Sequence, residues 1–478
     1  MTTLTFLGAA QRVTGSCYLI RNGQQQILLE CGMLQGENSN GKRGGKRKKS
    51  NTTGNNGSHF PFEVADIDAV VISHAHLDHS GMLPLLAKQG YQGPIYMTRQ
   101  TQALLPTMHK DAAFLQEKDA EWENKRRARA GKKAVEPLFN TADVELELGL
   151  CQGMAYGEEA EILPGIRLCF REAGHILGSA IVELWFDDKG DTRKLVFSGD
   201  LGNSQAPLMR DPAIITEADL LLMESTYGNR DHQPLEQTLD EFRAALDEAA
   251  DSGGNVLIPS FAVGRTQDLI YHLGQLYHAG QLKQNNIYID SPMATSISEI
   301  YEQNTRLFNK DDPEFRQIMT HDWQQWLPIL RFTRSVEESM ALNKIAGGAI
   351  IIAGSGMCHG GRIRHHLKYN LWRKNTHLII AGFQARGTLG RLLVDGVKKV
   401  KILGSEIAVK AQIHTLGGFS AHAGQSQLLE WAGHMRKSMP RLYLVHGESE
   451  SMLALQKRFI EEFNWDASIP TLGEIIHF

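Results

Sequence analysis

The stretch His74-Ala75-His76-Leu77-Asp78-His79 places four side chains that bind metal ions within six residues. It follows the apolar run 69–72, Ala-Val-Val-Ile, which is typical of a buried strand. A hydrolytic metal centre needs ligands on a rigid rim, with positions left open for water and substrate. Three histidines and an aspartate packed this closely are costly to bury unless a metal ion shares their charge. We therefore predict a site for two adjacent cations here, the alternative being a solvated loop that holds these residues by chance.

The composition describes a globular protein of more than one domain. At 478 residues, with 42% hydrophobic and 22% charged residues, the chain is long enough for two cores. Its net charge of -4 at pH 7 means that a polyanion has to bind through local basic patches. The N-terminus has no cationic segment before its short apolar run, and no apolar stretch approaches the roughly 20 residues of a membrane span. A cytoplasmic enzyme without membrane attachment is expected.

The five cysteines are scattered along the chain, and none forms a CxxC pair. This pattern supports neither a disulfide framework nor a thiolate zinc site.

Two segments are strongly basic. Residues 36–58 are rich in Gly, Asn, Ser, Lys and Arg and contain KRGGKRKK, so they cannot bury apolar area and are expected to form a mobile loop. Its six cations could contact a nucleic-acid backbone, although a solvated insertion without function is the equal alternative. A second cluster, KRRARAGKK, ends a helical region predicted over 101–129. Cations at such a position mostly form a solvated face near the helix carboxyl terminus.

Several apolar segments end in a polar residue, which is typical of α/β sheets whose reactive groups lie beyond the carboxyl ends of the strands. They are 194–197 before Asp200, 220–223 before Glu224, 256–258 before Ser260, 287–289 before Asp290 and 442–445 before His446. Amphipathic helices alternate with strands from about 255 to 400, which predicts a second α/β unit with a parallel sheet.

Two metal ions need more than four ligands, so further donors have to come from distant segments. His175 lies in AGHILGSA, Asp200 lies in FSGDLG and His446 lies in YLVHGE. Individually each could be structural, and a lone core histidine is the usual alternative for His175. Together with HAHLDH they complete a set of seven ligands, in which the Asp200 carboxylate could bridge two cations.

A family resemblance follows from these motifs. HAHLDHSG, AGHILGSA, FSGDLG and VHGE resemble the metallo-β-lactamase fold. MESTYG, PSFAVGRTQ, SGMCHGGR, QARGTLGR and GGFSAH are similar to its β-CASP branch of nucleic-acid-processing nucleases. The resemblance implies an α/β protein: an αββα metallo-β-lactamase sandwich with an inserted β-CASP domain that carries a mainly parallel sheet. It places the first part of the sandwich at 1–228, the β-CASP domain at 229–404 and the return segment at 405–478.

The resemblance also implies roles for individual residues. It assigns two Zn²⁺ per chain, one held by His74, His76 and His175, the other by Asp78, His79 and His446, with Asp200 between them. A metal-bound hydroxide, aligned by Asp78, would hydrolyse RNA phosphodiester bonds and leave a 3′-hydroxyl and a 5′-phosphate. His422 in GGFSAH would be the general acid and Glu224 its partner. His446 occupies a position that is His in RNA-directed members and tends to be Val in DNA-repair members, so RNA is favoured.

Predicted substrate contacts come from glycine-rich turns and two arginines. Ser355 and Gly356 follow the apolar run 349–352, and their N–H groups could meet a phosphate, although such glycines usually serve turn geometry. Arg265 in AVGRTQ and Arg386 in QARGTLGR are candidate phosphate contacts, with a buried structural arginine as the alternative.

Two positions depart from the family pattern. Glu30 precedes Cys31-Gly32 where the family has Asp, so the longer side chain has to sit differently behind the histidine loop. Gly424 occupies a position that is normally acidic, two residues after His422. Neither change removes a metal ligand.

Three functions remain as alternatives to a zinc ribonuclease acting on single-stranded RNA. They are a DNA-directed nuclease of the same family, a catalytically weak RNA-binding scaffold and a small-molecule hydrolase of the wider fold. The residues do not separate endonuclease from 5′-to-3′ exonuclease action. A homodimer is common in the family, but no segment establishes one here.

Overall fold

The computed structural model describes residues 2–34, 59–188, 190–204, 206–308, 322–382, 384 and 387–478. The predicted basic loop at 36–58 and Arg386 lie outside these residues. The chain forms two compact units, one made of Met1–Ser204, Arg210–Asp231 and His422–Phe478, the other of Gln205–Met209 and His232–Ala421. All five cysteines are free thiols. No helix among the described residues is both long and apolar enough to span a membrane.

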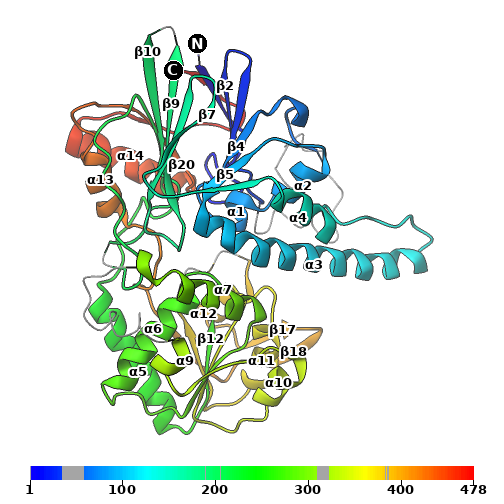
Figure 1. Ribbon diagram of the computed structural model, residues 1–478. Helices are drawn as coiled ribbons and strands as arrows, with labels where there is room; N and C mark the ends of the chain where they lie inside the picture. Colours follow the sequence, from blue (N-terminus) through cyan, green and yellow to red (C-terminus); the bar gives the residue numbers. More distant parts are fainter. Residues whose placement is uncertain are drawn as a thin grey trace. The chain divides into compact units, whose positions relative to one another are not determined.

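Two seven-stranded sheets form the centre of the first unit (Figure 1). The first sheet has the order β22 (Ile475–His477), β1 (Thr2–Phe6), β2 (Tyr18–Asn22), β3 (Gln25–Leu29), β4 (Ala69–Val71), β5 (Ile95–Thr98) and β6 (Cys151–Met154). The second has the order β21 (Ala467–Ser468), β20 (Arg441–Val445), β11 (Leu220–Glu224), β10 (Asp191–Phe197), β9 (Ala180–Asp188), β8 (Ile166–Glu172) and β7 (Glu159–Leu163). Both sheets mix parallel and antiparallel pairs.

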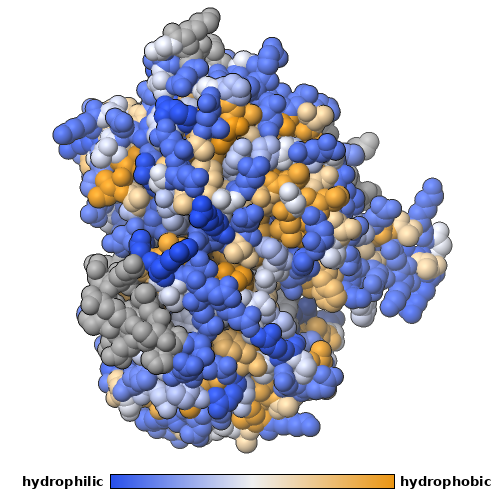
Figure 2. All heavy atoms as spheres, in the orientation of Figure 1, coloured by the Kyte–Doolittle hydropathy of each residue, from blue (hydrophilic) through white to orange (hydrophobic). Residues whose placement is uncertain are grey.

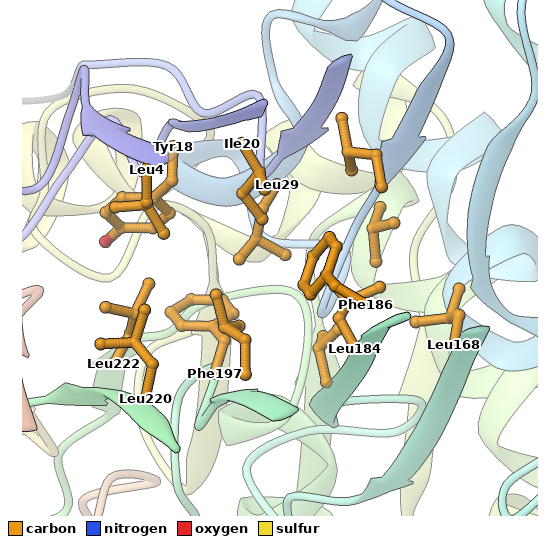
Figure 3. Close-up of a cluster of buried hydrophobic side chains, with 14 of the residues drawn as sticks. Leu4, Tyr18, Ile20, Leu29, Leu168, Leu184, Phe186, Phe197, Leu220 and Leu222 are labelled. Carbon is orange, nitrogen blue, oxygen red and sulfur yellow. The ribbon is translucent and has the colours of Figure 1, made fainter. Parts of the chain in front are cut away.

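The facing surfaces of these two sheets make one apolar core (Figure 3). Leu4, Tyr18 and Leu29 from the first sheet point toward Phe197 and Leu222 from the second. The rings of Tyr18 and Phe197 meet edge to face, with centroids 5.5 Å apart. Each fully buried side chain of this size contributes about 1.5–3 kcal/mol through loss of exposed apolar surface. This core fixes the strand ends from which the candidate site is built.

Helices cover the outer faces of both sheets, which completes four layers. Beside the first sheet lie η1 (Val64–Asp66), α1 (Leu77–Ser80), α2 (Leu83–Lys88), α3 (Arg99–Arg129) and α4 (Thr141–Leu148). On the second sheet, α13 (Gln425–Gly433) and α14 (Ser449–Phe463) bury Leu428, Leu429 and Phe459 against β11 and β20. The predicted αββα sandwich is therefore confirmed.

The second unit is built on a six-stranded sheet in which every pair of neighbours is parallel. Its order is β14 (Leu330–Phe332), β13 (Asn286–Ile289), β15 (Ala349–Ala353), β12 (Val256–Pro259), β16 (His377–Ile380) and β19 (Gln412–Thr415). A separate hairpin joins β17 (Lys399–Ile402) to β18 (Ser405–Ala408). The helices are α5 (Leu235–Asp251), α6 (Arg265–His278), α7 (Pro292–Gln303), η2 (Thr305–Leu307), α9 (Trp323–Trp326), α10 (Val336–Leu342), α11 (Ile363–Asn370) and α12 (Leu389–Val394). The expected parallel sheet is confirmed.

The second unit extends to Ala421, whereas the sequence places the end of the insertion at about Gly404. The difference arises because β19, at 412–415, pairs in parallel with β16 at the edge of the six-stranded sheet. The boundary of the inserted domain stays a prediction, because the extent of a compact unit and the extent of an insertion along the sequence are different quantities.

Asp290, one of the polar residues that follow the predicted strands, has a structural role in the second unit. It follows β13, is fully buried, and accepts hydrogen bonds from Ser339 Oγ (2.6 Å), Arg362 (2.7 Å) and His366 Nε2 (2.6 Å), as well as from Thr333. Burial raises the pKa of this carboxyl group, but the hydrogen bonds, that of His366 first, hold it well below its usual range. The carboxylate therefore ties the segment after β14, α10 and the start of α11 to β13.

We expect Asp290→Asn to lower the free energy of unfolding of the second unit by about 3 kcal/mol at pH 7, because donors built around a carboxylate lose charged partners. The folded pKa lies below the unfolded value of about 3.9. Its contribution is therefore present above that value and is lost as the pH falls toward the folded pKa. The difference between wild type and variant in urea unfolding should shrink from pH 7 to pH 3. Asp395→Asn, at a half-exposed ion pair, should change stability by less than about 0.5 kcal/mol.

Candidate metal centre

The HAHLDH segment turns directly from β4 into α1. His76 has extended backbone angles just before the first helical turn, and Asp78 and His79 lie inside that turn. Ser80 Oγ donates to the carbonyl oxygens of Ala75 (3.0 Å) or His76 (3.1 Å), which closes the turn from inside. This local geometry directs His74 and His76 from the end of the strand, and Asp78 and His79 from the helix, toward the same region.

The first donor group consists of three histidines and one aspartate. His76 Nδ1 lies 3.1 Å from His74 Nε2 and 3.2 Å from His175 Nε2. Asp200 Oδ2 lies 3.5 Å from His74 Nε2 and 3.6 Å from His175 Nε2. His175 reaches this place from the loop between β8 and β9, and Asp200 from the loop after β10.

The second donor group shares Asp200 with the first. His79 Nε2 lies 3.1 Å from His446 Nε2, and His446 Nε2 lies 3.5 Å from Asp78 Oδ2. The other oxygen of Asp200, Oδ1, lies 3.4 Å from His79 Nε2. The structure thus brings all seven predicted donors close together, with Asp200 beside both sets of histidines, and their roles as metal ligands stay a prediction.

These distances fit the coordination of zinc. Ligand atoms around a tetrahedral zinc with bonds of about 2.0–2.1 Å lie roughly 3.3 Å apart, close to the 3.1–3.6 Å separations observed in both groups. Nitrogen and oxygen donors without thiolates suit zinc. Asp200 Oδ1 is buried and has no hydrogen-bond donor among the described residues, although His79 Nε2 lies 3.4 Å from it. An orphaned carboxylate oxygen at the junction of two histidine groups is what a bridging ligand requires.

The electrostatics of three donors, His74, His76 and Asp78, favour the protonation states that bind metals, whereas burial lowers the pKa of His79 but the carboxylates around it, Asp200 first, raise it more, to above its usual value. Burial keeps the pKa of His74 well below its usual value and lowers that of His76 to about 4, so both imidazoles are neutral near pH 7. Burial raises the pKa of Asp78, but its hydrogen bond to His446 and the nearby histidines lower it more, to about 2. Asp78 is therefore a carboxylate at neutral pH.

Glu30 supports the cluster from behind, in the position where the family has Asp. Its Oε1 accepts a hydrogen bond from Ser73 N (2.6 Å), and its Oε2 accepts one from Ser73 Oγ (2.9 Å) and contacts His79 Nδ1. The Glu30 backbone has a φ of 64°, in the left-handed region that side chains rarely adopt. A carboxylate at Nδ1 leaves the Nε2 lone pair of His79 directed at the cluster. The side chain of Glu30, although longer than that of Asp, still contacts His79 Nδ1.

His422 and Glu224 meet at the edge of the cluster. Glu224 ends β11 and is fully buried, and its Oε1 lies 3.2 Å from His422 Nδ1. The His422 ring is 4.4 Å from that of His175, and its Nδ1 lies 4.0 Å from Asp200 Oδ2. Burial lowers the pKa of His422, but the carboxylates around it, Glu224 first, raise it more, to about 9. The carboxylate beside His422 is therefore that of Glu224. Gly424 is the N-cap residue of α13.

A buried network that the sequence did not suggest anchors the histidine segment to α3. Ser80 Oγ lies 3.0 Å from His109 Nε2, and His109 Nδ1 lies 2.9 Å from Glu147 Oε2. All three side chains are fully buried. They are 29 and 38 positions apart, so no local motif could have predicted them. The network fixes the Ser80 hydroxyl that closes the turn carrying the metal-ligand candidates.

The predicted substrate contacts belong to the second unit, whereas the seven donors belong to the first. Ser355 follows β15, and its Oγ accepts a hydrogen bond from Gly360 N (3.1 Å) within the same loop. Gly356 is buried beside Phe261, whose ring an added Cβ would meet at 2.7 Å. Arg265 begins α6 and is only 9% exposed. Their role in substrate binding stays a prediction.

A third histidine group, His377 and His414 with Glu248, lies in the second unit. The two rings are within 11° of coplanar, with His377 Nδ1 2.9 Å from His414 Nε2 and centroids 5.2 Å apart. Coplanar rings that meet edge to edge form an in-line N–H···N hydrogen bond. The lone pair of one nitrogen is thus directed at the proton of the other, and this group has no shared point for a cation.

Comparison with known proteins places this fold and donor set in a class. Three family models match: the metallo-beta-lactamase superfamily at residues 10–157, the Beta-Casp domain at 266–393 and the Zn-dependent metallo-hydrolase RNA specificity domain at 406–470. The architecture is thus that of a zinc-dependent metallo-hydrolase with an RNA specificity domain.

Named relatives agree with this class. Ribonuclease TTHA0252 of Thermus thermophilus is 39% identical over 454 residues, which cover 94% of each chain. Transcription termination factor FttA of Methanothermobacter thermautotrophicus is 30% identical over 98% of this chain and 70% of its own length. The same factor from Methanocaldococcus jannaschii is 29% identical over 94% of this chain and 67% of its own length. The chain belongs to the β-CASP branch of the metallo-β-lactamase superfamily, as the motifs predicted.

Proposed function

We propose that this chain is a zinc-dependent ribonuclease that holds two Zn²⁺ and hydrolyses RNA to products with a 3′-hydroxyl and a 5′-phosphate. The observation that carries the proposal is the arrangement of Asp200, whose two oxygens face two separate histidine groups. The match to an RNA specificity domain and the likeness to a ribonuclease support RNA as the substrate. An RNA-binding scaffold without activity is less well supported, because the seven donors are complete and converge.

The seven donors would hold the metal ions in two positions that share one carboxylate. His74, His76 and His175 would bind one zinc, and Asp78, His79 and His446 the other. Bound zinc would lower the pKa of a water molecule and neutralise charge on the phosphoryl oxygens. Glu30 would keep His79 in the tautomer that offers Nε2 to the metal.

Three residues of the site would act on protons: Asp78, which would also bind zinc, together with His422 and Glu224. Asp78 is ionised, so its carboxylate accepts a hydrogen bond from the attacking water and orients it. His422 is protonated at neutral pH, and its Nδ1–H donates to Glu224. Its Nε2–H is then available to protonate the ribose oxygen that leaves when the P–O bond breaks. Glu224 sets both the tautomer and the orientation of this acid.

The direct test measures cleavage of labelled single-stranded RNA together with the zinc content of the same sample. We expect about two zinc ions per chain, loss of cleavage after chelation, and recovery when zinc is restored. DNA of the same sequence is the matched control and should be cut more slowly, because His446 is typical of RNA-directed members. RNA cleavage that persists in the chelated, zinc-free protein would refute the proposal. Faster cleavage of DNA would assign the chain to the DNA-directed alternative.

A further inference from the structure

Helix α3 has a buried half and an exposed half. Its first half packs on the unit and includes Leu104, Leu105 and His109, all fully buried. From Phe114 to Arg129, a segment that the structure describes completely, no residue is buried. Figure 1 shows this half of α3 extending beyond α4. The exposed half contributes nothing to the core, so its side chains need another explanation.

One face of the exposed half alternates aromatic and cationic side chains. Phe114, Lys118, Trp122 and Arg126 follow one another at intervals of four residues, which places them on one helix face. Phe114 is 52% exposed and Trp122 is 76% exposed. Lys118 Nζ lies 5.6 Å from the Phe114 ring centroid. We call these four residues the α3 stripe.

The stripe leads into an ordered basic tip at 125–133, which contains six cations and no acidic residue. The chain turns back after α3 and is held there by Asn124, whose side chain makes two hydrogen bonds with the backbone of Val135 (2.7 and 2.9 Å). Arg127 donates to the carbonyl oxygen of Lys133 (3.2 Å). These hydrogen bonds hold the segment 133–135 against the end of α3. The cations before and after the turn therefore lie close together.

Most of this charge has no ion-pair partner among the residues that the structure describes. Glu123 pairs with Arg126 and Arg127, but no ion pair with a described residue involves the other four cations of the tip, Lys125, Arg129, Lys132 and Lys133. Cations this close together repel one another, and a polyanion would relieve the repulsion. The sequence alone favoured a solvated face for these residues. A solvated face explains the cations, but it does not explain the exposed rings of Phe114 and Trp122 beside them.

The chemistry of the surface favours single-stranded RNA over a protein partner. The cores of protein interfaces are depleted in Lys, whereas three of the six cations of the tip are lysines. Figure 2 shows the projecting arm as mostly hydrophilic, without a continuous apolar patch on the face in view. Nonspecific binding of single-stranded nucleic acid, in contrast, combines cations for the phosphates with aromatic rings on which bases stack.

We propose that the α3 stripe and the basic tip bind single-stranded RNA outside the metal centre. The inference rests on the proposed function, because it takes the substrate as its ligand. His109 contacts the histidine segment through Ser80, and Trp122 lies 13 residues further along the helix. At about 1.5 Å per residue this is roughly 20 Å, so only RNA longer than a few nucleotides can reach both places. The surface therefore raises affinity for long substrates.

The test uses the zinc-loaded protein with a long labelled oligouridine and a dinucleotide as substrates. In one variant Lys125, Arg126, Arg129, Lys132 and Lys133 are all changed to Gln, and in another Trp122 is changed to Ala. For the five-cation variant, the slope of log affinity against log salt should fall by about 3.5, which is 0.7 for each cation lost. Trp122→Ala should weaken binding roughly tenfold. Both should raise KM for the long RNA and leave kcat and dinucleotide cleavage unchanged.

Two controls separate RNA binding from folding. Leu115→Ala removes an apolar side chain that is 54% exposed next to the stripe, and it should leave RNA binding unchanged. Exchanging Lys and Arg at the five tip positions keeps the charge and should keep the salt slope. Wild-type slope and KM in both test variants would overturn the proposal, as would loss of self-association by Trp122→Ala with RNA binding intact. If the wild type neither binds nor cuts RNA, the proposed function fails as well, and the dinucleotide assay identifies that case.

Discussion

Asp200→Asn is expected to abolish RNA cleavage and to release zinc, although the substituted side chain has the same shape. Each carboxylate oxygen faces one histidine group, Oδ2 toward His74 and His175 and Oδ1 toward His79. An amide keeps one oxygen acceptor and turns an N–H₂ group toward the other position, so one ion loses its shared ligand. Loss of metal-based charge stabilisation is worth several kcal/mol, or roughly 10³-fold or more in kcat/KM. Single-turnover cleavage and elemental analysis of the same preparation measure both effects.

The matched control for this variant is Glu183→Gln. Glu183 is another buried carboxylate of the second sheet, and it pairs with Arg171 and Lys194 rather than with the histidines. This change should lower stability while leaving zinc content and cleavage close to wild type. If Asp200→Asn kept both zinc ions and wild-type turnover, Asp200 would not bridge the two groups, and the dinuclear assignment would fail.

The candidate donors that follow strands could be anticipated from a short local pattern, whereas His175 became a candidate through its motif and the family resemblance. Asp200 and His446 follow apolar strands, and the carboxyl ends of neighbouring strands meet at one edge of a sheet. HAHLDH follows a third such strand. The same logic found the parallel sheet of the second unit, because buried parallel strands are nearly continuous apolar runs.

The contacts that the sequence could not predict join residues that are far apart along the chain. Ser80, His109 and Glu147 belong to three different helices, and Asp290 finds its partners 43 to 76 positions away. Each of these residue types is common in surface positions, so only the fold shows that they are buried together. The aromatic rings of α3 show the opposite difficulty. Their spacing predicts a helix, but it does not predict that the rings of Phe114 and Trp122 are exposed to solvent.

The domain boundaries remain a prediction for a physical reason. The RNA specificity domain matches from residue 406, whereas the second compact unit continues to Ala421. The segment between them holds β19, which pairs within the second unit, and it leads to His422, which pairs with Gly202 in the first. The family model therefore assigns residues 406–421 to the RNA specificity domain, whereas the compactness of the chain assigns them to the second unit.

His422→Ala is expected to retain zinc and to lose about 10²- to 10⁴-fold in kcat on RNA, the usual worth of a positioned general acid. The zinc should stay because His422 Nδ1 is directed at Glu224, 3.2 Å away, and its closest approach to Asp200 is 4.0 Å. KM should change little, because the proton is transferred only as the P–O bond breaks. Burst or single-turnover kinetics on RNA measure kcat and KM separately, and zinc analysis of the same sample measures metal retention.

A substrate that needs no acid distinguishes catalysis from structural support. A nitrophenyl phosphodiester has a leaving group that departs without protonation, so His422→Ala should cut it nearly as fast as wild type does. Glu224→Gln is the companion variant: it keeps the imidazole but removes the carboxylate that raises the pKa of His422 to about 9, so its loss on RNA should be smaller and should grow as the pH rises. Equal losses of His422→Ala on RNA and on the nitrophenyl substrate would mean that His422 holds the site together rather than donating a proton, because a collapsed site fails on every leaving group.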